Sequence, residues 1–145
     1  MKARLIVAAL AVGALFAFGS LRAADDKAEL KCPVSGKPAS ADHVVAFNGG
    51  EVQFCCPNCP KAFKAATKKF AGKANLQLVQ SKQLKQVKCP LTGRPMAADK
   101  VVDVEGTEIA VCCGGCLAKM KKLSGDALIN ALLADTSKGF VPAKK

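Results

Sequence analysis

The sequence of 145 residues predicts an α+β protein made of two tandem copies of one small unit, each with a tight turn, a β-hairpin and a helix. Two observations support this. First, within each copy the hydrophobic pattern changes from that of strands to that of a helix. Second, the chain repeats itself at a spacing of 57 residues without a gap, and 13 of the 28 positions from 32 to 59 are identical to their counterparts. A repeat of this kind indicates a duplicated unit, so we expect one self-contained site in each copy. The repeated cysteines are Cys32, Cys55, Cys56 and Cys59, matched by Cys89, Cys112, Cys113 and Cys116.

Each copy opens with a turn that carries its first cysteine. Residues 32–38 read CPVSGKP and residues 89–95 read CPLTGRP. Proline fixes φ and glycine accepts a left-handed conformation, so both stretches predict a tight turn.

A β-hairpin follows the turn. In the first copy the strands are expected at 44–47 and 51–54, joined by Asn48-Gly49-Gly50. The second copy repeats this pattern at 101–104 and 107–111, around Glu105-Gly106. A glycine between two short apolar runs is typical of a hairpin turn.

A helix is predicted after each cysteine cluster, FCCPNC at 54–59 and VCCGGC at 111–116. Pro57 or Pro60 suits a first helical turn. The pattern leaves two points open. Residues 75–79 are either a short strand or part of a helix, and residues 128–133 either continue the second helix or form another after Gly125. On the first helix one apolar face is expected to hold Ala62, Phe63, Ala66 and Phe70.

The first residues are typical of a secretory signal peptide. Lys2 and Arg4 precede an uncharged apolar run of 14 residues, which is shorter than the roughly 20 residues that a membrane-spanning helix needs. Cleavage is expected after Ala23, which predicts a secreted or periplasmic protein without a stable membrane span. The alternative is a membrane anchor. The predicted organisation is a signal peptide at 1–23, a short tail at 24–30, a first cysteine-rich unit at 31–72, a linker at 73–87, a second unit with a C-terminal helix at 88–135 and a basic tail at 136–145.

The chain is basic, with a formal net charge of +11. Its lysines are spread along the sequence, and it has no Trp or Tyr to stack on bases. We therefore expect no nucleic-acid partner. Besides a metal ion, an envelope protein or an anionic envelope polymer would suit an exported basic surface.

The cysteine positions favour a metal site. A cysteine in a glycine turn and further cysteines at a helix start are both in places that stabilise thiolates, the form that binds zinc. A unit of this size also needs a cross-link, because its core is small. Ser35 and Thr92 stand where a zinc knuckle would have its second cysteine.

The pattern C-x22-C-x3-C resembles the TRASH and YHS families of small cysteine-rich modules. The similar residues are Pro33-Val34-Ser35-Gly36, Phe54-Cys55, Cys59 and Phe63, and the resemblance covers roughly 31–70 and 88–127. It implies a treble-clef-like fold, metal binding with zinc as the usual structural ion, and no catalysis. Roles in heavy-metal or copper handling are proposed for some members. The departure from the family pattern is the hydroxyl residue, Ser35 or Thr92, in each knuckle.

The middle cysteine of each cluster, Cys56 or Cys113, is extra relative to the family pattern. We interpret it as a replacement for the missing knuckle cysteine, which makes all eight cysteines candidate ligands. The alternative is that it packs as a small buried hydrophobe. A site with only three thiolates would suit Cu(I) as well as zinc.

The cysteines allow two other uses. An even number of cysteines in a small exported chain is also typical of a disulfide-stapled interaction domain, with three possible pairings in each copy. A C-x-x-C pair at a helix start can also serve thiol–disulfide exchange, but the βαβ pattern of a thioredoxin is missing. His43 has Lys100 as its counterpart, so a duplicated site does not need it. The sequence predicts no enzyme.

Overall fold

The computed structural model describes residues 29–143. The predicted signal peptide and most of the short tail after it lie outside these residues. The described part is a mixed α+β structure with four helices and three two-stranded antiparallel sheets. Within residues 29–143, none of the helices combines the length and the apolar character that a membrane crossing requires.

The first half begins with the predicted turn. The Gly36 N–H donates to the Cys32 carbonyl at 2.8 Å, and Gly36 has a φ of 72°, a conformation that glycine adopts without strain. A β-hairpin follows, formed by β1 (Ser40–Phe47) and β2 (Gly50–Phe54). Strand β1 begins earlier than expected because an irregularity between Ser40 and Val44 lets its first residue pair with Phe54.

Two helices complete the first half, α1 (Asn58–Ala65) and α2 (Thr67–Gln80). The single apolar face expected from Ala62 to Phe70 is therefore divided between two helices. The break lies at Ala66, whose φ of −138° is not helical. The Thr67 hydroxyl donates to the Phe63 carbonyl at 2.9 Å, and such a bond competes with the backbone hydrogen bonds of a helix.

The second half repeats the order of the first. The turn again has its hydrogen bond, from the Gly93 N–H to the Cys89 carbonyl at 2.8 Å. The hairpin consists of β4 (Val101–Val104) and β5 (Thr107–Ala110), and the helices are α3 (Gly114–Met120) and α4 (Gly125–Leu133). Of the two alternatives left open for residues 128–133, a separate helix after Gly125 is the one found.

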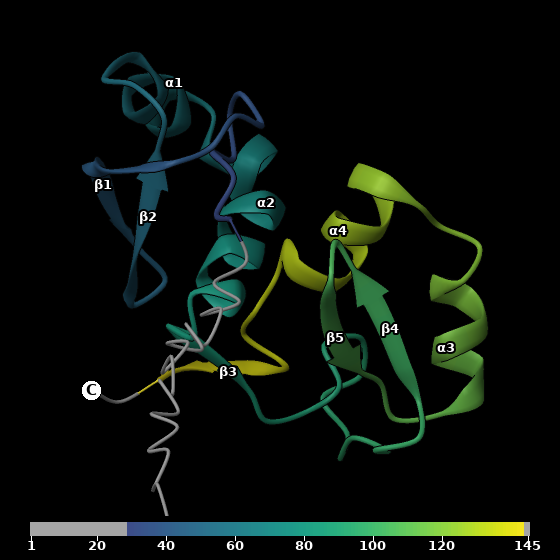
Figure 1. Cartoon of the computed structure of the whole chain (residues 1–145). Coiled ribbons are helices and arrows are strands. Elements are labelled where there is room, and N and C mark those ends of the chain that lie inside the picture. Colours follow the sequence, from purple (N-terminus) through teal and green to yellow (C-terminus); the bar gives the residue numbers. More distant parts are fainter. Residues whose placement is uncertain (1–28, 144–145) are drawn as a thin grey trace, which may run out of the picture.

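Helix against helix and strand against strand join the two halves (Figure 1). Helices α2 and α4 pack together in the middle of the molecule, with the hairpins on either side. A Cβ atom on Gly72 would lie 2.4 Å from the Asn130 Oδ1, so the helices approach closely there. Strand β3 (Leu84–Gln86) pairs with β6 (Phe140–Pro142). Residues 73–87, expected as a linker, thus hold the end of α2 and all of β3, and the expected tail from 136 onward contains β6.

Each half has its own hydrophobic core. The first core lies between the hairpin and the helices α1 and α2, and the edge-to-face ring pair of Phe47 and Phe63 is part of it. The second core lacks these rings. It takes Leu76 from α2 and Phe140 from β6, and it is completed by α4 through Ile129, Leu132 and Leu133. The second core is therefore completed both by α4 and by a residue of the first half.

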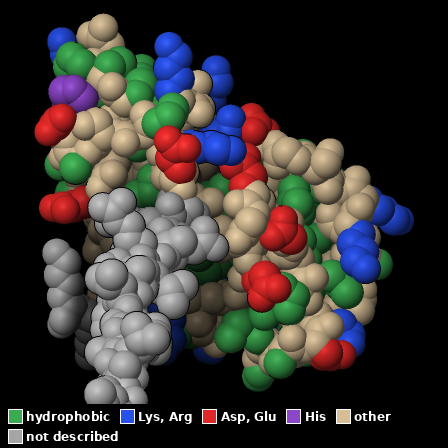
Figure 2. Space-filling view, in the orientation of Figure 1, with side chains coloured by type: hydrophobic (Ala, Val, Ile, Leu, Met, Phe, Trp, Pro, Cys, Tyr) green, Lys and Arg blue, Asp and Glu red, His purple; other side chains and the backbone are tan. Residues whose placement is uncertain are grey.

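The basic side chains do not form one patch on the face shown in Figure 2. Lysine and arginine side chains lie in several separate places, with acidic side chains among them. Among the described residues, two ion pairs join the two halves, from the Lys31 Nζ to the Glu105 carboxylate at 3.1 Å and from the Lys73 Nζ to the Asp126 carboxylate at 2.9 Å.

Candidate metal centres

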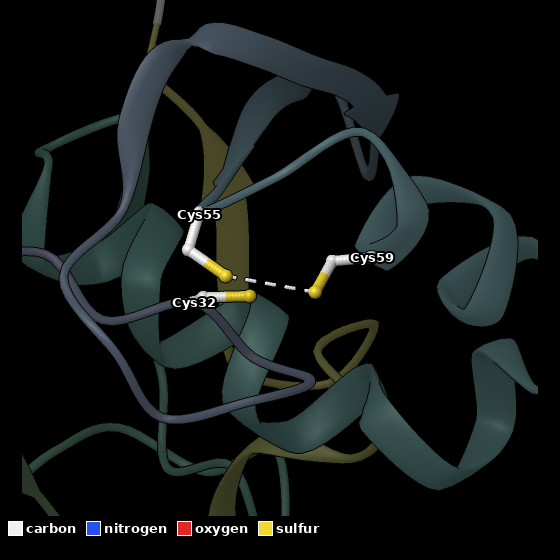
Figure 3. Close-up of side chains that lie close together, drawn as sticks. All are labelled: Cys32, Cys55 and Cys59. Atoms are coloured by element: carbon white, nitrogen blue, oxygen red, sulfur yellow. Dashed lines mark hydrogen bonds between the residues drawn. The ribbon is translucent and has the colours of Figure 1, made fainter.

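The first candidate site brings together Cys32, Cys55 and Cys59, whose sulfur atoms all lie within 4.8 Å of one another. Cys32 comes from the turn, Cys55 follows the end of β2, and Cys59 lies in the first turn of α1. Figure 3 shows the three sulfur atoms pointing toward a common point. The hairpin therefore returns the chain to the turn, and the helix supplies the third thiol.

The second candidate site has the same construction. It consists of Cys89, Cys112 and Cys116, again within 4.8 Å of one another. In both sites the first and third cysteines are buried and the middle one is half-buried. The triads predicted from the family pattern are thus brought together in both halves.

The sulfur separations suit a soft metal ion. Thiolates about 2.3 Å from a tetrahedrally coordinated zinc ion lie about 3.8 Å apart. The Cys55 and Cys59 sulfur atoms are 3.6 Å apart, and the Cys112 and Cys116 sulfur atoms are 3.7 Å apart. These distances are far longer than a disulfide bond. All eight cysteines lie in the described part of the chain, and each is a free thiol there.

The first cysteine of each site has a lowered pKa, which favours its thiolate form. Burial acts to raise the pKa of Cys32, but hydrogen bonds from the Ser35 hydroxyl and from backbone N–H groups outweigh it and lower this pKa to about 7. The pKa of Cys89 is likewise lowered to about 7, with Thr92 in the role of Ser35. Ser35 and Thr92 therefore stabilise negative charge on Cys32 and Cys89. They do so from the positions at which the family pattern has a ligand cysteine.

The third cysteine of each site behaves in the opposite way. Burial is the main cause that raises the pKa of Cys59, and the neighbouring thiols of Cys56, Cys55 and Cys32 add to it. Burial likewise raises the pKa of Cys116, to about 12. These two thiols therefore keep their protons at neutral pH.

The hydroxyls of Ser35 and Thr92 also contact the second thiol of each triad, that of Cys55 or Cys112. The Ser35 Oγ lies 3.1 Å from the Cys55 Sγ, and the Thr92 Oγ1 lies 3.2 Å from the Cys112 Sγ. Each hydroxyl thus lies directly beside its triad.

Cys56 and Cys113 fall outside the triads. Cys56 is half-buried and its Sγ lies 3.4 Å from the Cys59 Sγ, whereas Cys113 is exposed. Their role as ligands stays a prediction. His43 lies in β1 and belongs to neither cluster.

Two glutamines that no sequence motif indicated connect the turn of each site to the second strand of its hairpin. The Gln77 amide bonds to the backbone of Gln53 and Lys31, and the Gln86 amide bonds to the backbone of Ala110 and Lys88. No sequence signal could have revealed them, because Gln77 and Gln86 are not counterparts in the repeat.

No family model matches the chain, and neither the curated proteins nor the solved structures give a match.

Proposed function

We propose that the protein binds one soft metal ion in each half, zinc or Cu(I), through cysteine thiolates, and that it has no catalytic activity of its own. The observation that carries this proposal is the recurrence of the same three-thiol cluster in both halves, with sulfur separations of 3.6 and 3.7 Å. Thiolates are the ligands that select Zn²⁺ and Cu(I) over hard cations. The pKa of about 7 for Cys32 and Cys89 supports the same chemistry.

The resemblance to the TRASH and YHS families belongs to this proposal. We propose that each half is a treble-clef-like unit, in which turn, hairpin and helix hold one ion. The order of these elements in both halves supports it. Cys56 and Cys113 lie outside the triads and are candidates for a further thiol ligand beside them.

Export is the other part of the proposal. The signal-peptide pattern of residues 1–23 supports a secreted or periplasmic protein. There the protein would act as a metal-handling protein or as a metal-stabilised binding module. The net positive charge would favour an envelope protein or an anionic envelope polymer as partner.

Native mass spectrometry of the full chain, exported to its own compartment, tests the metal sites. We expect two metal ions in each molecule and eight thiols that become reactive on unfolding. Four disulfides and no metal would contradict the proposal and would favour the disulfide-stapled interaction domain.

The metal and its lability need a second measurement. Competition between zinc and Cu(I) for the purified chain identifies the preferred ion. Release to a mild chelator then separates the two uses, because a metal-handling site gives up its ion quickly and a structural site keeps it.

A further inference from the structure

We infer that the two metal sites are not equivalent: Cys56 supplies a fourth thiolate to the first site, whereas Cys113 stays out of the second site and leaves one coordination position open. This inference rests on the proposed metal binding and assigns a different use to each site. The first would retain its ion, and the second would exchange it.

Cys56 and Cys113 have different surroundings although they are counterparts in the repeat. The Cys56 Sγ is half-buried and lies 3.4 Å from the Cys59 Sγ, close to the separation of thiolates that share a metal ion. Cys113 is exposed.

The cause lies in the hydrogen bond that each middle cysteine accepts on its carbonyl. The Cys113 carbonyl accepts from the Leu117 N–H at 3.1 Å, the four-residue spacing of an α-helix. The counterpart of Leu117 is Pro60, which has no N–H to donate. The Cys56 carbonyl accepts instead from the Cys59 N–H at 3.2 Å, at a spacing of three residues. This tighter turn brings the two ends of the first C-x-x-C together.

The backbone at Cys113 is extended. Cys113 is the residue before α3, and its φ of −160° and ψ of 166° are those of extended chain. Helix α3 begins directly after it at Gly114, whereas α1 begins at Asn58, one position later in the repeat.

The consequence is a difference in coordination. Structural zinc sites are closed by four protein ligands, and sites that exchange a ligand keep a position open. With Cys56 the first site has four thiolates. The second site has three, and the Cys112 thiol is half-buried, so a soft donor such as a thiol of another molecule can reach an ion held there.

The test uses full-length chains in which one site is disabled. Cys116→Ser disables the second site, so that the first can be measured alone. Cys59→Ser disables the first site, so that the second can be measured alone. Zinc affinity is measured by chelator competition, and cobalt(II) is the spectroscopic probe, since its sulfur charge-transfer absorption grows with the number of bound thiolates. We expect Cys56→Ser to weaken the first site at least about tenfold, with loss of cobalt absorption. The matched Cys113→Ser should change neither the zinc affinity nor the cobalt absorption of the second site.

A separate variant tests the cause. Pro60→Ala restores an N–H at position 60 while both cysteines stay in place. We expect the first site then to lose zinc faster and to show the cobalt spectrum of the second. Circular dichroism checks that every variant is folded.

Three results would overturn the inference: equal losses from Cys56→Ser and Cys113→Ser, no loss from either, or unchanged zinc release in Pro60→Ala. Failure of the proposed function looks different, since the parent chain would then bind no metal ion at all.

Discussion

The side-chain amide of Gln77 bonds to both backbone groups of Gln53. Its Oε1 accepts from the Gln53 N–H at 2.6 Å, and its Nε2 donates to the Gln53 carbonyl at 2.8 Å. The same Nε2 donates to the carbonyl of Lys31 at 3.0 Å. Gln77 is buried in α2, so its amide ties strand β2 to the residue just before Cys32. The turn and the strand that carry two of the three thiols are thereby held together.

The second half reaches the same arrangement from a different element. Gln86, in β3, bonds to the N–H of Ala110 at 3.0 Å and to its carbonyl at 2.7 Å, and also to the carbonyl of Lys88 at 3.2 Å. Ala110 and Lys88 are the repeat counterparts of Gln53 and Lys31.

Replacement of Gln77 by Ala should destabilise the protein and loosen the first site. It removes three part-buried hydrogen bonds to the backbone of Gln53 and Lys31, and each lost bond costs about 0.5–1.5 kcal/mol. Urea denaturation measures the free energy of unfolding, and chelator competition measures the zinc affinity. Gln86→Ala should have the same effect on the second site. Gln80→Ala is the control, because the Gln80 amide makes only a long, exposed bond to the Glu105 carbonyl. Equal stability of the Gln77 and Gln80 variants would contradict the role of the buried amide.

Metal affinity should fall as the pH falls, and more steeply below about pH 7. Above that value Cys32 and Cys89 are thiolates, while Cys59 and Cys116 keep a proton that the metal has to displace. Below it Cys32 and Cys89 are protonated too, so each ion displaces a further proton. Zinc competition with a chelator of known proton affinity, repeated from about pH 6 to about pH 8, gives the slope. An affinity that does not change over this range would count against thiol ligands.

Replacement of Thr92 by Cys should strengthen the second site. The Thr92 hydroxyl lies 3.2 Å from the Cys112 Sγ, so a thiol there is within reach of the triad. We expect zinc release to slow at least about tenfold, since a fourth thiolate closes the site. Ser35→Cys should have a smaller effect if Cys56 already supplies the fourth thiolate of the first site.

Thr92→Val serves as the isosteric control. It removes the hydroxyl that lowers the pKa of Cys89 without adding a ligand, so it should weaken metal binding. If Thr92→Cys and Thr92→Val changed zinc release in the same direction, the position would not be a fourth coordination site.

Replacement of Gly72 by Leu should separate the two halves. A Cβ atom at this position would lie 2.4 Å from the Asn130 Oδ1 and 3.3 Å from the Asn130 Cα, so a larger side chain has to push α4 away. We expect a loss of about 1–3 kcal/mol in the free energy of unfolding, although leucine is the better helix former. Gly114→Ala is the matched control, because no atom lies within 4 Å of a Cβ atom at Gly114. Similar stability of the two variants would show that α2 and α4 do not meet as closely as described.

The fold class and the triads could be predicted from the sequence because both depend on local patterns that occur twice. Both turns carry glycine at a left-handed φ, at Gly36 and Gly93, and the hairpin turns do the same at Gly49 and Gly106. Once such turns are placed, the strand lengths fix where Cys55 and Cys112 return to the first cysteine. The helices begin shortly after that point, at Asn58 and Gly114, and carry Cys59 and Cys116 in their first turns.

The amino-acid sequence by itself thus determined the duplicated unit, its hairpins and the three thiols of each site. Only the tertiary structure decided how the halves join and how their sites differ. The pairing of β3 with β6 and the crossing of Gly72 with Asn130 are contacts between segments far apart in the chain, which no local pattern reports. The bonds of Gln77 and Gln86 are also invisible to local patterns, because the two residues bond to equivalent backbone groups from different elements, α2 and β3. Cys56 and Cys113 likewise differ in burial and in the hydrogen bond that each carbonyl accepts, although their spacing in the sequence is identical.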